Sequence, residues 1–82
     1  MNSEKLIKLH DFLVNDGWAV LYTTKNDTIY SKEDSHELFV PTSTNHPIIN
    51  DAYNLAIEEL AELYNIEEDD ILHRIYGKQE ND

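Results

Sequence analysis

The sequence predicts a small α+β domain in which one helix, three antiparallel strands and a second helix are followed by an extra short helix. Apolar residues recur with helical spacing near both ends of the chain, whereas residues 18–40 hold short aromatic and β-branched runs separated by polar turns. The chain has 82 residues, of which 40% are hydrophobic and only two are glycine, so we expect one core. Residues 1–77 are therefore predicted to form a single domain, and residues 78–82 a frayed acidic tail.

The first helix is expected to follow Ser3, whose hydroxyl can accept a hydrogen bond from a free amide of the first turn. Leu6, Leu9 and Leu13 then recur at the spacing of one helix face. The Asn-Asp-Gly sequence at residues 15–17 is predicted to end this helix.

Three short antiparallel strands are predicted at residues 18–24, 28–30 and 36–40. The first two are rich in aromatic and β-branched residues, and the polar residues 25–27 between them indicate a hairpin. Pro41 should end the third strand, because proline has no amide to donate to a neighbouring strand.

A long helix and a short one are predicted after the strands. Pro47 suits the first position of the long helix, where its missing amide is no loss. One apolar face of that helix should cover the sheet. Its residues are Ile49, Ala52, Tyr53, Ala56, Leu60, Leu63 and Tyr64. Asn65 should interrupt it, and the acidic residues 67–70 should begin a last helix, which Gly77 ends.

The charge of the chain is strongly negative and unevenly distributed. It has 17 acidic and six basic residues, a formal net charge of −11, and ten of the acids lie from Pro47 onward. Such a field repels nucleic acid and membrane phosphates and favours a basic protein surface as partner. The absence of cysteine and of a long apolar run predicts a soluble, cytoplasmic protein without disulfides or a membrane span.

Three segments of the chain follow the order found in a known family of toxins. They are residues 3–9, the Gly17-Trp18 step and the Leu-Phe-Val-Pro run at residues 38–41. Over about residues 3–64 the chain resembles the HicA-like toxins of the double-stranded-RNA-binding-like fold. Members that cleave RNA carry a Gly-Ser-His element entering the second strand, where this chain has Lys-Asn-Asp-Thr at residues 25–28. Ser35-His36 lies instead at the third strand. The resemblance therefore implies a scaffold without nuclease chemistry, redirected to another partner.

Metal and catalytic sites are not expected. Asp69 or Asp70 with His73 makes at most a two-ligand fragment, so no metal or other cofactor is predicted. Glu58 and Glu62 are one helical turn apart, but they lie opposite the apolar face, where solvated carboxylates are poor acid–base catalysts. The chain also lacks a glycine-rich phosphate loop and a cysteine nucleophile, and we expect no enzymatic activity.

The aromatic residues of the sheet permit two interpretations. Trp18, Tyr22, Tyr30 and Phe39 could stack on single-stranded nucleic acid, but such a platform needs a basic rim, so we expect them to pack in the core. Tyr22, Tyr30 and Tyr53 can still present a polar tip to a protein partner, and the first two are included among the candidate partner-binding residues.

A cluster of seven carboxylates is the main candidate partner-binding site. Its members are Glu58, Glu59, Glu62, Glu67, Glu68, Asp69 and Asp70. Solubility alone is one interpretation of these charges. The other is a surface that docks a lysine- or arginine-rich protein, because crowded like charges reduce stability without some compensating role.

The leading hypothesis is a non-catalytic inhibitor or antagonist that occludes the nucleic-acid-binding surface of a basic protein by mimicking phosphate. A phage anti-defence or anti-CRISPR-like role and an antitoxin-like role both fit it. Direct contact with nucleic acid or membranes is not expected. One alternative is a degenerate HicA-like protein that binds or processes RNA through the sheet or His36, and another is a structural homodimer.

Overall fold

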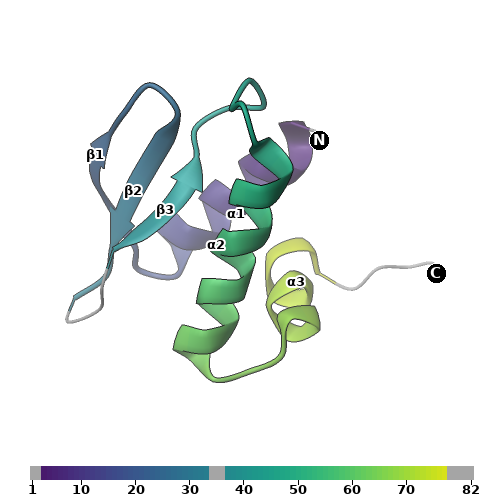
Figure 1. Cartoon of the computed structure of the whole chain (residues 1–82). Coiled ribbons are helices and arrows are strands. Elements are labelled where there is room, and N and C mark those ends of the chain that lie inside the picture. The colour runs from purple at the N-terminus through teal and green to yellow at the C-terminus, as the bar shows by residue number, and fades with distance from the viewer. Residues whose placement is uncertain (1–2, 34–36, 78–82) are drawn as a thin grey trace.

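The computed structural model describes residues 3–33 and 37–77, and it confirms the predicted α+β architecture (Figure 1). The elements are α1 (Ser3–Asn15), β1 (Ala19–Thr23), β2 (Asp27–Ser31), β3 (Leu38–Pro41), α2 (Ile49–Tyr64) and α3 (Glu68–Tyr76). The predicted tail at residues 78–82 and the Ser35-His36 pair lie outside the described residues. No helix within the described ranges is long and apolar enough to cross a membrane.

The three strands form one antiparallel sheet in the order β1-β2-β3. Ile29 in the middle strand pairs with Tyr22 on one side and Phe39 on the other, so these three side chains share a face. The register shifts between Val20 and Tyr22, which leaves Leu21 as an extra residue in β1. Every residue of β1 is exposed, because this strand lies at the edge of the sheet, away from α2.

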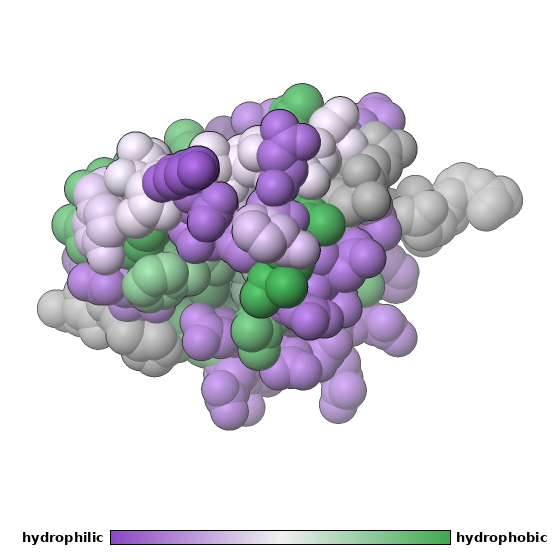
Figure 2. Space-filling model, turned by 45° about the horizontal axis from the view of Figure 1, so that its top comes forward, coloured by the Kyte–Doolittle hydropathy of each residue, from purple (hydrophilic) through white to green (hydrophobic). Residues whose placement is uncertain are grey.

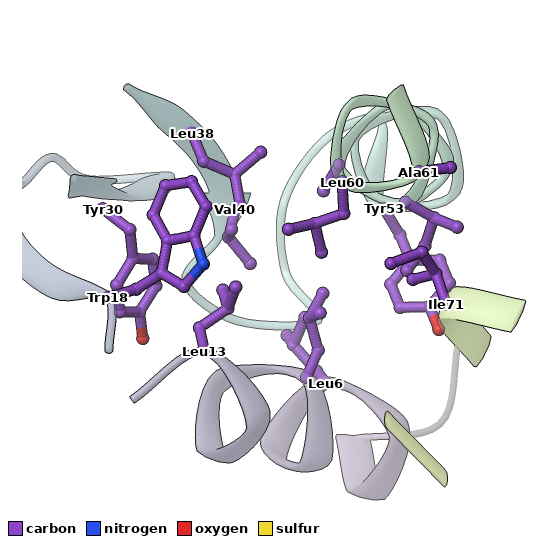
Figure 3. Close-up of a cluster of buried hydrophobic side chains, with 13 residues drawn as sticks. Leu6, Leu13, Trp18, Tyr30, Leu38, Val40, Tyr53, Leu60, Ala61 and Ile71 are labelled. Carbon is purple, nitrogen blue, oxygen red and sulfur yellow. The ribbon is translucent and has the colours of Figure 1, made fainter. Parts of the chain in front are cut away.

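The core lies where the inner face of the sheet meets the three helices. Labelled side chains from the sheet, α1 and α2 point toward one another in Figure 3, and Ile71 of α3 lies beside Tyr53 and Ala61. Leu6, Leu9 and Leu13 of α1 and Leu60 of α2 have almost no exposed area, because their helical spacing places them on the inner faces, whereas Leu63 is partly buried. The last helix packs against both α1 and α2, so it belongs to the same core.

The ends of the helices explain how the chain turns. Asn65 takes the left-handed conformation with φ of 59°. Its backbone N–H donates hydrogen bonds to the carbonyls of Ala61 and Glu62, which ends α2 as predicted. The predicted start of α2 at Pro47 was wrong, because Ile48 is the N-cap and the helix begins at Ile49. The Nδ1 of His46 accepts the Ile48 amide at 3.1 Å, so a side chain outside the helix satisfies this donor.

Two groups of tyrosine hydrogen bonds join elements that are distant in sequence. The Tyr53 and Tyr76 hydroxyls bond to each other, and Tyr76 donates to the Lys5 carbonyl at 3.1 Å, which connects α2, α3 and α1. The Tyr64 hydroxyl donates to Asp16 and accepts the indole N–H of Trp18 at 3.0 Å. These bonds hold α3 and the end of α2 in place, and they fix how both helices present their outer faces.

Candidate protein-binding surface

The structure places all seven predicted carboxylates on the molecular surface. Glu58, Glu59 and Glu62 are exposed on the second half of α2. Glu67 is the N-cap of α3, and the other three acids occupy its exposed first turn. Both segments flank the turn between α2 and α3, at the lower end of the molecule in Figure 1. The chain therefore gathers the acidic residues around one end of the helical layer.

These carboxylates keep their charge uncompensated within the described residues. The two ion pairs in residues 3–33 and 37–77 join Lys32 to Asp16 at 3.2 Å and His46 to Asp27 at 3.3 Å, and neither involves the cluster. Arg74, on the same helix as three of the acids, lies 5.8 Å from the centre of the Tyr64 ring. The cluster thus presents net negative charge to solvent.

Helix initiation accounts for part of this charge. Glu68, Asp69 and Asp70 lie in the first turn of α3, where the helix dipole favours acidic side chains. Glu67 makes no side-chain capping hydrogen bond, however, although it occupies the N-cap position. Of the three glutamates of α2, only Glu62 lies in the last turn, where the dipole disfavours an acidic side chain, and Glu58 and Glu59 lie further from the helix end. The dipole therefore favours all four acids at the start of α3, including Glu67, whereas the α2 acids have no stabilising role in helix formation.

The two candidate tyrosines have different environments. Tyr22 is 47% exposed on the outer face of β1, and it is accessible to a partner as proposed. Tyr53, which was also expected to emerge partly, is 5% exposed. Tyr30 is only 3% exposed, contrary to the expectation that its tip would reach a partner. Its hydroxyl lies 2.6 Å from Nδ1 of His10, whose Nε2 lies 2.9 Å from the Pro41 carbonyl. Burial, and then the charge of Asp11, raises the pKa of Tyr30.

The expectation that all four sheet aromatics pack in the core was also wrong. Trp18 and Tyr30 are buried there, but Tyr22 and Phe39 are 47% and 52% exposed on the opposite face. Strand residues alternate between faces, and the helices cover only the face that carries Tyr30. Ile29, between Tyr22 and Phe39, is fully buried outside the core cluster. The outer face therefore carries a short apolar row.

An apolar groove lies between this outer face and α2. Its apolar lining comes from Phe39 of β3, the N-cap Ile48 and Leu55 of α2, together with two alanines of α2. Asp27, His46 and Glu59 supply its polar lining. In Figure 2 hydrophobic side chains lie next to one another in the middle of this face, with hydrophilic side chains around them. This hollow, called the β3–α2 groove below, is not among the features that the sequence predicts.

The possible metal ligands do not form a site. Asp69 and His73 line the same surface hollow, but Lys5 lines it too, and its ammonium opposes a bound cation. Within the described ranges no three histidine or acidic side chains are grouped so that they could hold a metal ion. Of the possible ligands considered from the sequence, Asp69 and His73 thus share one hollow, whereas Asp70 does not line it.

A second hollow beside Trp18, Lys32 and Tyr64 has a structural explanation. Lys32 pairs with Asp16 and lies 5.3 Å from the centre of the Tyr64 ring. Burial, together with the hydrogen bond to Asp16, raises the pKa of Tyr64. The polar groups here bond to one another, and they connect the turn after α1 and the residue after β2 to the end of α2.

Comparisons with protein families, with curated proteins and with solved structures found no match to this chain.

Proposed function

We propose that the protein is a small acidic module without catalytic activity that binds a basic protein surface and keeps nucleic acid away from it. The observation that carries the proposal is the exposed cluster of seven carboxylates around the α2–α3 turn, which takes part in no ion pair among the described residues. Glu58 and Glu62 lie one turn apart on α2, and together with the acids at the start of α3 they place several negative charges close together, as successive phosphates do. A lysine- or arginine-rich site that receives a nucleic-acid backbone would accept them.

The mechanism has two steps. The field of a chain with net charge −11 first attracts a basic surface, over a range of about 8 Å at physiological ionic strength. Contact with the cluster then occludes the nucleic-acid site. Because the first step is electrostatic, the association rate falls as salt is added.

An antagonist of a nucleic-acid enzyme is the class of protein that this mechanism describes. A phage anti-defence or anti-CRISPR-like inhibitor and an antitoxin-like inhibitor both act by blocking such a surface. We therefore place the protein among inhibitors of this kind, acting in the cytoplasm. A partner would be a nucleic-acid-binding protein with a basic groove or patch.

RNA binding through the sheet is the second candidate, because Tyr22 and Phe39 are exposed on one face and can stack on bases. Asp27 and Glu59 lie at the border of that face, beside the β3–α2 groove. Acidic neighbours oppose contact with phosphate, so we rank this function below protein binding.

Affinity capture with two matched variants tests the proposed function. Glu58→Lys with Glu62→Lys reverses two charges of the cluster, and Asp11→Lys with Glu37→Lys reverses two exposed charges elsewhere. Each pair changes the net charge from −11 by +4, to −7. We expect the first pair to weaken binding to the captured partner about tenfold, because attraction becomes repulsion at the contact. The second pair should have a much smaller effect.

Equal loss with both pairs would mean that the overall field, not the cluster, determines binding. Unchanged capture by the first pair would refute the proposal. Retention of labelled RNA by the protein alone, abolished by substitution of Tyr22 and Phe39, would favour the second candidate instead.

A further inference from the structure

The β3–α2 groove is a feature that phosphate mimicry does not explain. Phe39, Ile48 and Leu55 line it and are 52%, 57% and 58% exposed. These three large apolar side chains share one hollow and form a contiguous exposed patch, and such patches mark interaction sites on soluble proteins. The groove has a volume of about 420 Å³, and its lining comes from two strands, a loop and α2.

The groove is held in shape by His46. The ring accepts the Ile48 amide on Nδ1 at 3.1 Å, so the proton of the neutral ring is on Nε2. This Nε2 lies 3.3 Å from Asp27 and donates to its carboxylate. The connection before α2 is thereby fixed to the start of β2, and the groove is preformed instead of being made by a loose loop.

The charges at the groove indicate which partner fits it. Asp27 and Glu59 are the formally charged side chains of its lining, and no lysine or arginine among residues 3–33 and 37–77 belongs to it. Glu58 and Glu62 follow on the exposed side of the same helix. A nucleic acid, an anionic lipid surface or a second copy of this chain, itself of net charge −11, would be repelled. A segment with an apolar side and flanking basic residues is complementary in both respects.

We propose that the β3–α2 groove binds a basic amphipathic segment of a protein partner, with an apolar side chain against Phe39, Ile48 and Leu55. Lysine or arginine residues on either side of that anchor pair with Asp27 and Glu59 and continue onto the α2 carboxylates. This inference rests on the proposed function and adds a hydrophobic anchor to it. The acidic cluster supplies attraction to many basic surfaces, and the groove selects one that carries an apolar residue at the right place.

Two synthetic peptides serve as probes. One is a helical peptide with leucine on one face and lysine on the other, and the second replaces every leucine with glutamine at the same charge. Binding is followed by isothermal titration and by chemical-shift changes in the labelled full-length protein. We expect the leucine peptide to bind more tightly and to shift the resonances of Phe39, Ile48 and Leu55.

Matched variants separate the groove from general hydrophobic contact. Leu55→Ser should raise the Kd for the leucine peptide about fivefold, because the exposed part of one leucine loses its contact. The control is Ile7→Ser on α1, which removes an equally exposed residue, 58% in both cases, and should change the Kd less than about twofold. Thermal unfolding of each variant checks that it is folded.

The proposal is overturned if Leu55→Ser binds the leucine peptide as tightly as the unsubstituted protein, or if Ile7→Ser loses as much affinity. A dimer in solution that Leu55→Ser dissociates would also overturn it, by placing a second copy in the groove. The glutamine peptide distinguishes the two proposals. If binding of the glutamine peptide depends on Glu58 and Glu62 while Leu55→Ser leaves binding of the leucine peptide unchanged, this inference alone has failed.

Discussion

Replacing Ile71 with alanine tests whether α3, which carries three of the seven acids and is capped by a fourth, is fixed to the core. Ile71 has no exposed area and is the buried residue of α3. Removing a buried isoleucine side chain to alanine costs about 2–5 kcal/mol, from lost apolar burial and the cavity that remains. We take about 3 kcal/mol, because the site lies between helices at the border of the core and can partly close.

That loss is large for this chain. At roughly 0.05–0.15 kcal/mol per residue, a domain of this length has a total stability of about 4–12 kcal/mol. In a domain of this size each kcal/mol lowers the melting temperature by about 4–8 °C, so the expected fall is about 12–24 °C. The control is Leu55→Ala, at a site 58% exposed, which should change the stability by less than about 0.5 kcal/mol.

Urea and thermal unfolding followed by circular dichroism measure both variants. A urea midpoint for Ile71→Ala equal to that of the unsubstituted protein would refute the packing of α3 described above. The acidic cluster would then be presented by a helix free to move, and its carboxylates would not form a fixed row.

Two further predictions concern the tyrosines. Burial raises the pKa of four of them above the ordinary value of 10.0, so the unfolded chain loses these protons first. These residues are Tyr30, Tyr53, Tyr64 and Tyr76. The stability that these four hydroxyls contribute should be constant below about pH 10 and fall as pH rises further. Urea midpoints measured together with tyrosinate absorbance test this, and equal midpoints at about pH 9 and about pH 11 would contradict it. Tyr64→Phe leaves the buried indole N–H of Trp18 without its acceptor at 3.0 Å, and it should lower the free energy of unfolding by about 1–3 kcal/mol. The control is Tyr22→Phe at an exposed site, which should have almost no effect on stability. Unfolding monitored by Trp18 fluorescence measures both variants, and equal stabilities would contradict the role of this hydrogen bond.

Helical periodicity is sufficient to predict the helices of this fold. Leu6, Leu9 and Leu13 are buried as expected, because a spacing of three or four residues places side chains on one face regardless of the partner. Asn65 ends α2 for an equally local reason, its tolerance of the left-handed conformation. The start of α2 depends on the hydrogen bond from the Ile48 amide to His46, and the position of His46 depends on how the loop before the helix folds.

The burial of the sheet residues depends on tertiary packing, which the sequence does not reveal. Trp18, Tyr22 and Phe39 are all large aromatic residues of predicted strands, yet only Trp18 is buried. The difference arises because β1 lies at the edge of the sheet and the helices cover one face. Alternation along a strand indicates two faces, but it does not say which of them is covered.

The acidic half of the candidate site follows from the sequence, whereas the groove does not. Glu58 and Glu62 lie opposite the apolar stripe of α2, so their exposure is a local consequence of the helix. The groove joins Asp27, Phe39 and residues of α2, which are separated by long stretches of chain. Leu55 is the one signal that was available, as an apolar residue among the polar positions of a predicted helix. The resemblance to HicA-like toxins stays a prediction.

The measurement that tests the central claim most directly is displacement of labelled DNA or RNA from the captured partner by increasing amounts of this protein. At one fixed salt concentration we expect complete displacement, weakened about tenfold by the Glu58→Lys and Glu62→Lys pair but much less by the Asp11→Lys and Glu37→Lys pair. A partner that binds this protein and its nucleic acid at the same time, with neither affinity changed, would contradict the account.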